Sequence, residues 1–491
     1  MPFLQECVTF GLLFLIMVSF GCQNVSSQSD SLGLEWEQHW DTYGVGGTCC
    51  YGTDNFFVGD IDNDGIEELI TGGFSYLTEN GTRVSIEAPL KIWNWNGRNL
   101  TCESSISWIG SIRTLFASDI DNDGLIEIIT GGVSVADSDR IPQINVWRYD
   151  GEKSSRKGSY DGISASSICV ADLKVNKNPL VLIVGGTTQE NRSYAQLTVF
   201  QWTENELSLL DSEKWCSSNE AHAYSVFAQD LNNDGHPEII TGGYDNDLTN
   251  SSGQVRIWSW ADNHLVLETC KEWQMVTNVF GVTISGLPMG NTMINNVKAA
   301  DVDSDGVSEV ISGGFTYDGQ VFNAQLRIWN WTGSDLILEK SQKWISEDIT
   351  EVKSISLNDV DKDNEIEIIT SGLTSVYGSF NNTECTPDYA QLRVWNWKDN
   401  SLTLEISKDW TVGDGVVAWN LVTSDLDNDN TAEIVTVGCM GVSGQCDPDL
   451  RIWSINTKQN TVGLPLELLI VAAAIIGIFG ILIYVIRRKL S

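Results

Sequence analysis

Residues 230–238 read Asp-Leu-Asn-Asn-Asp-Gly-His-Pro-Glu, and residues 239–243 continue with Ile-Ile-Thr-Gly-Gly. This stretch decides the fold because it returns along the whole chain. Successive copies start about 53 to 71 residues apart, which is the length of one four-stranded unit, so the sequence predicts seven such units. The other copies begin at Asp60, Asp119, Asp301, Asp359 and Asp425, with a degenerate copy at Asp172.

Each of the six good nonapeptides predicts a cation-binding loop. Oxygen side chains at positions one, three, five and nine can converge on one ion. The turn between them needs a positive φ at position six, which Gly supplies in four copies and Asn364 and Asn430 in the other two. A carboxylate-rich, all-oxygen set suits a hard cation, and suits Ca²⁺ better than Mg²⁺ because Ca²⁺ accepts flexible coordination.

We therefore expect about six bound Ca²⁺ ions. The predicted metal-site residues occupy positions one, three, five, seven and nine of the six loops: Asp60, Asp62, Asp64, Ile66, Glu68, Asp119, Asp121, Asp123, Leu125, Glu127, Asp230, Asn232, Asp234, His236, Glu238, Asp301, Asp303, Asp305, Val307, Glu309, Asp359, Asp361, Asp363, Glu365, Glu367, Asp425, Asp427, Asp429, Thr431 and Glu433.

The composition agrees with a folded, metal-rich protein. The formal net charge is −37, which is typical of disordered acidic chains, but 19 Trp and 42% hydrophobic residues argue against disorder. Part of the acidity belongs to the loops themselves. Because no basic stripe is present to neutralise phosphates, we expect no nucleic-acid partner.

Each unit is expected to contain four strands. In the fourth unit they cover residues 223–229, 238–243, 254–260 and 265–273, with the cation loop between the first two. Ile and Trp fill the third strand on both faces, as expected when a small sheet packs between two others. The predicted fold is all-β, a seven-bladed β-propeller of four-stranded blades over residues 32–456.

The chain ends are predicted to meet in the last blade. The final unit stops after its third strand, residues 450–455, and lacks a fourth. Residues 32–40 carry the Leu-x-Leu-Glu pattern with a final Trp that ends the fourth strand of other units, for example at 336–344 and 402–410. We therefore expect this N-terminal strand to close the last blade.

Seven repeats of strand, Asp-x-Asp-x-Asp-Gly-x-x-Glu loop and strand resemble the FG-GAP/VCBS repeats of integrin α-subunit propellers. The resemblance covers roughly residues 32–456. It implies Ca²⁺ in the loops of one face and ligand contacts from the loops of the other. It does not extend to the third unit, where Lys174 stands at position three and Leu180 at position nine. No integrin leg or inserted ligand domain is visible, so integrin ligands and signalling do not transfer.

Apolar segments at both ends predict export and membrane anchorage. The run Val8 to Phe20 is typical of a signal-peptide core, here assigned to residues 1–21, although Gly21-Cys22 also resembles a lipoprotein cleavage site. After a linker at 457–466, the 19 uncharged residues from Leu468 to Ile486 predict a transmembrane helix over 467–486. Basic residues follow in a short cytoplasmic tail, 487–491, so the propeller is expected outside the cell membrane.

Cysteine spacing and sequons fit an extracellular domain. Cys439 and Cys446 flank what looks like one hairpin loop and are the predicted disulfide pair. Sites of the Asn-x-Ser/Thr type occur within the predicted propeller and are expected to carry glycans. They are Asn80, Asn99, Asn191, Asn250, Asn330 and Asn381.

The sequence favours a binding or adhesion ectodomain over an enzyme. The chain has only four His, and His222 is the one candidate for catalysis; a lyase or hydrolase acting on glycan or lipid, and a structural coat component, are the alternatives. An extracellular protein or glycan ligand is expected on the face opposite the calcium loops. The long loops 274–294 and 373–390 lie there. The first offers Phe280, Leu287, Met289 and Met293, which are either ligand contacts or plugs of the central channel.

Overall fold

The computed structural model is all-β in the part of the chain that it describes. That part comprises residues 31–39, 55–79, 82–136, 139–151, 153–174, 178–190, 192–217, 219–246, 251–274, 283–284, 287–288, 292–376, 388–413, 415–440 and 447–456.

The third to sixth repeats each form a four-stranded antiparallel set. In the fourth repeat, β14 (Glu220–Gln229), β15 (Glu238–Asn246), β16 (Ser251–Ala261) and β17 (His264–Trp273) pair in chain order. These bounds lie within a few residues of those predicted. The same order holds in three other repeats. The third contains β10 (Ser167–Ala171), β11 (Leu180–Gln189), β12 (Arg192–Thr203) and β13 (Glu206–Trp215), and the fifth contains β20 (Thr292–Ala300), β21 (Glu309–Tyr317), β22 (Phe322–Trp331) and β23 (Leu336–Trp344). The sixth contains β24 (Ile349–Asn358), β25 (Glu367–Ser375), β26 (Tyr389–Lys398) and β27 (Ser401–Trp410).

The first two repeats share a strand. β6 (Leu100–Ser118) pairs through its first half with β5 (Thr82–Trp95) and through its second half with β7 (Glu127–Ala136). It is thus the outer strand of one set and the innermost strand of the next. The remaining strands of these sets are β2 (Phe56–Gly59), β3 (Glu68–Gly72), β4 (Ser75–Glu79), β8 (Asp139–Tyr149) and β9 (Ser154–Asp161).

The first and last described strands pair with each other. β28 (Val416–Ser424), β29 (Glu433–Met440) and β30 (Asp447–Asn456) form three strands of a sheet, and β1 (Ser31–His39) is the fourth, next to β30. The Arg451 guanidinium contacts the Glu37 carboxylate of β1 at 2.9 Å. The N-terminal strand therefore completes the sheet that the final repeat leaves unfinished.

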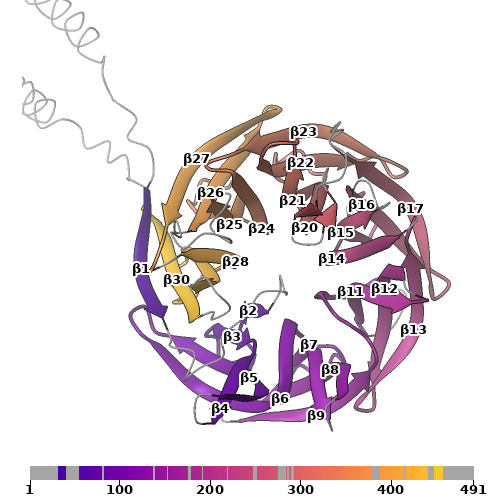
Figure 1. Cartoon of the computed structure of the whole chain (residues 1–491), viewed down its shortest axis with the longest axis vertical. Helices are drawn as coiled ribbons and strands as arrows, with labels where there is room; N and C mark the ends of the chain where they lie inside the picture. Colours follow the sequence, from indigo (N-terminus) through magenta and orange to yellow (C-terminus); the bar gives the residue numbers. More distant parts are fainter. Residues whose placement is uncertain are drawn as a thin grey trace, which may run out of the picture. The chain divides into compact units, whose positions relative to one another are not determined.

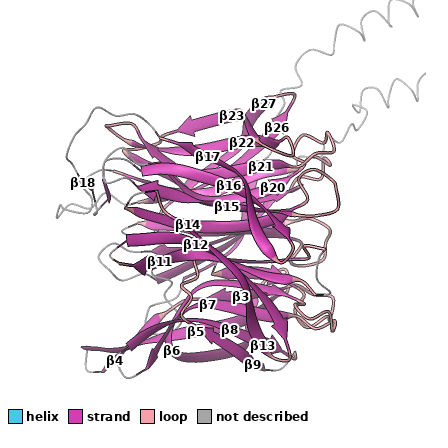
Figure 2. Ribbon diagram, turned by 90° about the vertical axis from the view of Figure 1, so that its right-hand side faces the viewer, coloured by secondary structure: helices cyan, strands magenta, loops and turns pink. Residues whose placement is uncertain are grey.

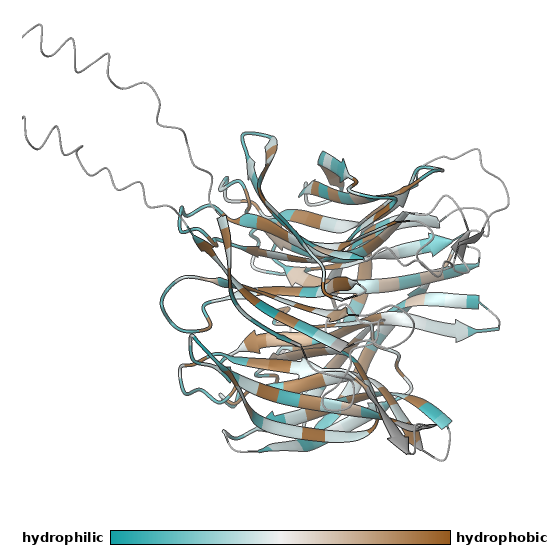
Figure 3. Cartoon of the chain, turned by 60° about the vertical axis from the view of Figure 1, so that its left-hand side comes forward, coloured by the Kyte–Doolittle hydropathy of each residue, from teal (hydrophilic) through white to brown (hydrophobic). Residues whose placement is uncertain are grey.

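The sheets are blade-like and follow one another around a common axis, as in a β-propeller (Figure 1). Each innermost strand contacts the innermost strand of the next set, from β2 through β6, β10, β14, β20 and β24 to β28, and β28 contacts β2. Apolar cores fill the spaces between consecutive sets, and Figure 3 shows the apolar positions along the strands. One core joins Trp95 and Leu69 of the first repeat to Leu426 and Ile452 of the last.

The Thr-Gly-Gly segment explains why the sets pack so closely. A Cβ on Gly242 would meet Ile294 and Val297 of the next innermost strand. A Cβ on Gly243 would collide with the His222 carbonyl of β14, at a β-bulge between Ala223 and Ser225. The first glycine thus permits contact between neighbouring sets, and the second accommodates the bulge within a set.

In six of the repeats, a Trp of the third strand donates a hydrogen bond to a Thr or Ser of the second strand. In the fourth repeat the Trp258 indole N–H donates to Thr241 Oγ1 at 3.1 Å between adjacent strands. The third repeat has Ile183 and Phe200 at these register positions and cannot make the bond. Equivalent bonds join Trp93 to Thr71, Trp147 to Thr130, Trp329 to Ser312, Trp395 to Thr370 and Trp453 to Thr436.

The Trp that ends the outer strand connects one repeat to the next. The Trp215 indole N–H donates to Gln254 Oε1 of β16 at 3.1 Å, and its ring lies 5.3 Å from that of Trp258. Trp273 repeats this arrangement with Gln325 and Trp329. Because these side chains are half-buried in an inter-repeat contact, the repeated Leu-x-Leu-Glu element contributes stability through its final Trp.

Within the described residues the structure has no helix that could cross a membrane. The predicted signal peptide (1–21), linker (457–466), transmembrane helix (467–486) and cytoplasmic tail (487–491) lie outside those residues.

Candidate metal centres

The six good acidic nonapeptides form tight loops between the first and second strands of their repeats, all at the same edge of the sheets; residues 175–177 of the third repeat lie outside the described residues. We number them by repeat: loop 1 (60–68), loop 2 (119–127), loop 3 (172–180), loop 4 (230–238), loop 5 (301–309), loop 6 (359–367) and loop 7 (425–433). Figure 2 shows connections gathered at the two ends of the strands.

Each loop is held by its own aspartates. In loop 1, Asp60 accepts the Asp64 N–H through Oδ1 at 3.1 Å and the Gly65 N–H through Oδ2 at 3.0 Å. Asp64 Oδ1 accepts the Ile66 N–H at 2.8 Å. These bonds wrap the chain around the carboxylates and fix their spacing before any ion binds.

Two positions of the loop adopt a positive φ. Position six does so as predicted, with Gly65 at 88° and Asn364 at 69°. Position four does so as well, with Asn63 at 62°, which the nonapeptide pattern had not predicted. The signal was present, because Asn, which tolerates this conformation, stands there in four of the six good loops.

The position-four asparagines also join neighbouring loops. Asn63 Nδ2 donates to the Gly124 carbonyl of loop 2 at 2.8 Å, and Asn428 Nδ2 donates to the Gly65 carbonyl of loop 1 at 2.7 Å. A third bond of this kind runs from Asn233 to Gly306 at 2.6 Å. Residues up to 363 positions apart in sequence are thereby connected along this edge of the sheets.

The glutamate at position nine has two roles. It begins the second strand and is buried; Glu367, for example, is 1% exposed. Its Oε2 accepts the N–H of the apolar position-two residue, as from Val360 to Glu367 at 3.0 Å, and this holds the loop against the core. The other oxygen points to the aspartates. In loop 6 that atom, Glu367 Oε1, is buried without a hydrogen-bond partner, so a ligand there would satisfy it.

Five loops bring three carboxylates to within 4.8 Å of one another and could hold a metal ion. The groups unite positions one, three and nine. Position five is not a member. The position-seven side chains Ile66 and Leu125 are apolar and exposed, so only the backbone carbonyls of these residues could contribute. The five groups are Asp60, Asp62, Glu68; Asp119, Asp121, Glu127; Asp301, Asp303, Glu309; Asp359, Asp361, Glu367; and Asp425, Asp427, Glu433.

In the other two loops, a side chain of the loop contacts a carboxylate that would bind the ion. In loop 3, the Lys174 ammonium lies 2.6 Å from Asp172 Oδ2, so a side chain supplies the positive charge where the sequence predicted no ion. In loop 4, Asn232 replaces the second Asp. Its Nδ2 donates to Glu238 Oε1 at 2.8 Å, and its Oδ1 accepts the Asp234 N–H.

The electrostatics of the clusters favour a bound cation. Burial, followed by repulsion from nearby aspartates, raises the pKa of Glu309, Glu367 and Glu433 to about 8 and that of Glu68 to about 7, despite their bonds to backbone N–H groups. Like charges confined in a half-dry loop oppose ionisation. A divalent ion among these oxygens would offset the repulsion, and the donor set therefore fits a hard cation.

These shifts predict an unusual pH dependence without metal. The folded pKa values exceed the ordinary 4.5, so the folded state holds protons that the unfolded chain releases above that pH. Stability in the presence of chelator is expected to be full below about pH 4.5 and to fall as pH rises toward 8. Calcium competes with the same protons, so the difference in Tm with and without Ca²⁺ should widen by several degrees between pH 5.5 and 8. Thermal melts at the two pH values measure this, and a difference that narrows would contradict it.

The predicted ligand-face residues are only partly covered by the described structure. Met293 is 7% exposed and packs with Tyr244 and Phe315, so its side chain belongs to a core cluster. Leu287 lies in β19 (Leu287–Pro288), which pairs with β18 (Thr283–Ile284) in a small hairpin. Phe280 and Met289 lie outside the described residues.

The remaining predicted sites are also covered in part. Cys439 is disulfide-bonded, and its expected partner Cys446 lies beyond the described residues. Asn99 is exposed and Asn330 is half-buried, whereas the sequons at Asn80, Asn191, Asn250 and Asn381 lie outside the described part.

His222 is buried. Its Nε2 lies 2.8 Å from Ser166 Oγ, and its ring lies against Tyr224, with centroids 4.5 Å apart. Burial, with a smaller contribution from Arg113, lowers the pKa of His222 to about 4, so the imidazole is neutral at physiological pH. Its partner Ser166 is 7% exposed.

No known protein family and no curated protein matches this chain.

Proposed function

We propose that the chain is a cell-surface, calcium-binding ectodomain with a seven-bladed propeller of the FG-GAP/VCBS type, anchored by one C-terminal helix, that binds an extracellular protein or glycan. The observation that carries the proposal is the set of carboxylate groups repeated at one edge of consecutive sheets. The contacts of the innermost strands, which return from β28 to β2, support seven blades in a ring.

Calcium is the ion that the loops fit best. The described groups contain only oxygen donors, and in each group three carboxylates lie within 4.8 Å of one another. Mg²⁺ demands near-ideal octahedral geometry and keeps its water, whereas Ca²⁺ accepts six to eight oxygens in irregular arrangements. No group with the soft ligands that zinc prefers occurs among the described residues.

The ligand is proposed to bind at the edge opposite the calcium loops. Antiparallel strands alternate in direction, so the connections after the second and fourth strands share that edge. Two of these connections are long: β17 to β20 spans residues 274–291, and β25 to β26 spans 376–388. Long loops on a rigid scaffold are where binding residues concentrate.

A loop replacement tests the ligand face. In the full-length chain displayed on cells, residues 276–290 are replaced by a Gly/Ser segment, and Met293 is kept because it packs in the core. We expect unchanged surface expression and at least about tenfold weaker capture of the ligand found by glycan-array and cell-binding screens. A second variant carries the same replacement at 378–386, in the other long connection of this edge.

Undiminished binding by both folded variants would overturn this placement of the ligand. A regular surface lattice in electron microscopy, without ligand capture, would favour a coat component instead. Turnover of a glycan or lipid substrate that is abolished by Ser166→Ala would favour an enzyme, since Ser166 and His222 are in hydrogen-bond contact.

A further inference from the structure

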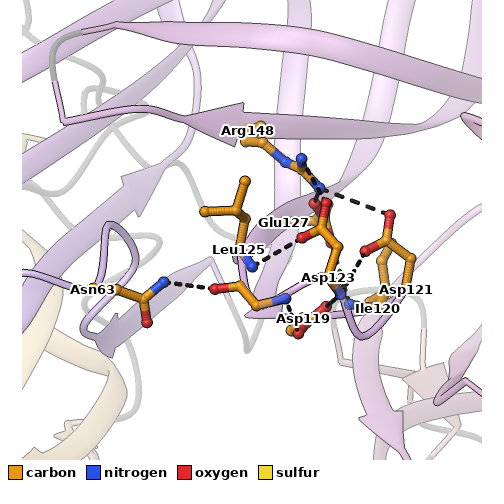
Figure 4. Close-up of polar contacts among 9 residues, drawn as sticks. Asn63, Asp119, Ile120, Asp121, Asp123, Leu125, Glu127 and Arg148 are labelled. Carbon is orange, nitrogen blue, oxygen red and sulfur yellow. Dashed lines mark hydrogen bonds and ion pairs between the residues drawn. The ribbon is translucent and has the colours of Figure 1, made fainter.

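A positively charged side chain from the adjacent strand contacts loop 2. Arg148 lies on β8 directly opposite Glu127 in the strand register and reaches into the carboxylate group (Figure 4). Its Nη2 bonds to Glu127 Oε1 and lies 3.7 Å from Asp121 Oδ2, and its Nη1 donates to Asp123 Oδ2 at 3.0 Å. One guanidinium therefore contacts loop positions three, five and nine.

Arg148 bonds to the glutamate oxygen that, in loop 6, remains available to a metal ion. Glu127 Oε2 holds the loop backbone through Ile120, as in the other loops, so Oε1 is the remaining atom. The equivalent Glu367 Oε1 in loop 6 has no partner. A basic residue near loop 6, Lys398, pairs instead with Glu365 and does not enter the carboxylate group.

The position of Arg148 is neutral in every other repeat. It follows the Trp of the third strand, or Phe200 in the third repeat, and the residues that follow elsewhere are uncharged. They are Asn94, Gln201, Ser259, Asn330, Asn396 and Ser454. A cation in this place is thus a departure from the repeat pattern, confined to the second repeat.

Building on the calcium-binding function proposed above, we propose that Arg148 is a built-in counter-ion that replaces calcium in loop 2. A planar guanidinium satisfies several carboxylate oxygens at once and remains charged at all physiological pH values. Calcium could enter only if Arg148 left, because two positive groups cannot share the same oxygens at this distance. Loop 2 consequently stays formed without metal and binds Ca²⁺ more weakly than loops 1, 5, 6 and 7.

Exchanging the residue between two loops tests the proposal. The full-length protein is compared with Arg148→Asn, which gives loop 2 the residue of loop 1, and with Asn94→Arg, which does the reverse. Bound calcium is counted by elemental analysis at a fixed free Ca²⁺ concentration, and affinities are measured by calorimetry. We expect Arg148→Asn to bind one additional ion, with at least about tenfold tighter binding at loop 2, and Asn94→Arg to lose one.

Thermal melts add a readout that a purely structural arginine would not produce. In chelator, Arg148→Asn should melt below the wild type, because loop 2 has lost its counter-ion. Saturating Ca²⁺ should remove that difference. A deficit of equal size in both conditions would mean that Arg148 only packs, and would overturn the proposal.

Asp121→Ala in the wild-type background separates the remaining outcomes. An unchanged ion count supports the proposal, since loop 2 holds no ion to lose. Loss of one ion shows that loop 2 is loaded despite Arg148 and overturns it. If neither the wild type nor any variant binds calcium, the proposed calcium-binding function itself is wrong.

Discussion

Removal of calcium by excess chelator is expected to lower the Tm of the intact protein by about 10 °C. An ion that binds only the folded state at 100 times its Kd stabilises that state by about 2.7 kcal/mol, and several independent sites add. Four loaded loops would stabilise the folded state by roughly 11 kcal/mol. The Tm shift is this free energy divided by the entropy of unfolding, which scales with the length of the folded part, residues 31–455. Differential scanning calorimetry with and without chelator measures the shift.

Single-loop variants serve as matched controls for this result. Asp301→Ala removes one carboxylate from the group with Asp303 and Glu309, and should cost one bound ion and a share of the Tm shift. Asp172→Ala should leave the ion count unchanged, because that carboxylate is already paired with Lys174. A protein that carries one ion or none and melts identically in chelator would disprove structural calcium.

Loss of the N-terminal strand is expected to have the second large effect. Replacement of residues 31–39 by a Gly/Ser segment of equal length should lower the Tm by about 5 °C or more, or cause aggregation. β30 would become an open strand edge, and the Arg451 guanidinium, itself buried, would lose Glu37. The ring of Trp36, which lies 5.7 Å from that of Trp95, would leave the core between the first and last repeats.

Replacement of residues 23–28 in the same way is the control and should have no effect on Tm. Addition of a synthetic peptide of residues 31–39 should restore the melting temperature in a concentration-dependent manner, because strand pairing between separate chains obeys mass action. If the replaced protein melts like the wild type, the N-terminal strand does not close the structure.

Local chemistry repeated along the chain explains what could be predicted. The nonapeptide at 230–238 predicts its own loop because Asp230 accepts backbone N–H groups four and five residues later. Alternating apolar residues predict the strands on each side, and the bounds of β14 to β17 agree within a few residues. The N-terminal strand, residues 32–40, could be assigned to the last repeat because its Leu-x-Leu-Glu pattern recurs in the fourth strand of other repeats.

Contacts between strands and between repeats explain which features could not be predicted from the sequence. Met293 reads as a loop residue in sequence, but it lies on β20, where Phe315 of its own set and Tyr244 of the preceding set bury it. The bond from Asn428 to Gly65 joins loops at opposite ends of the chain. No local pattern predicts either contact, because each depends on how separate sheets are placed.

The sequence by itself therefore determined the repeat, the strands, the acidic loops and the pairing of the chain ends, since each follows from periodic local chemistry. Only the tertiary structure decided which loops keep oxygens for a metal. Lys174 is two residues from Asp172, but Arg148 lies 21 residues beyond Glu127 and enters loop 2 from the adjacent strand. Whether a basic side chain lies beside a carboxylate group depends on the strand register as well as on the nonapeptide, because the register places residues of the adjacent strand next to the loop.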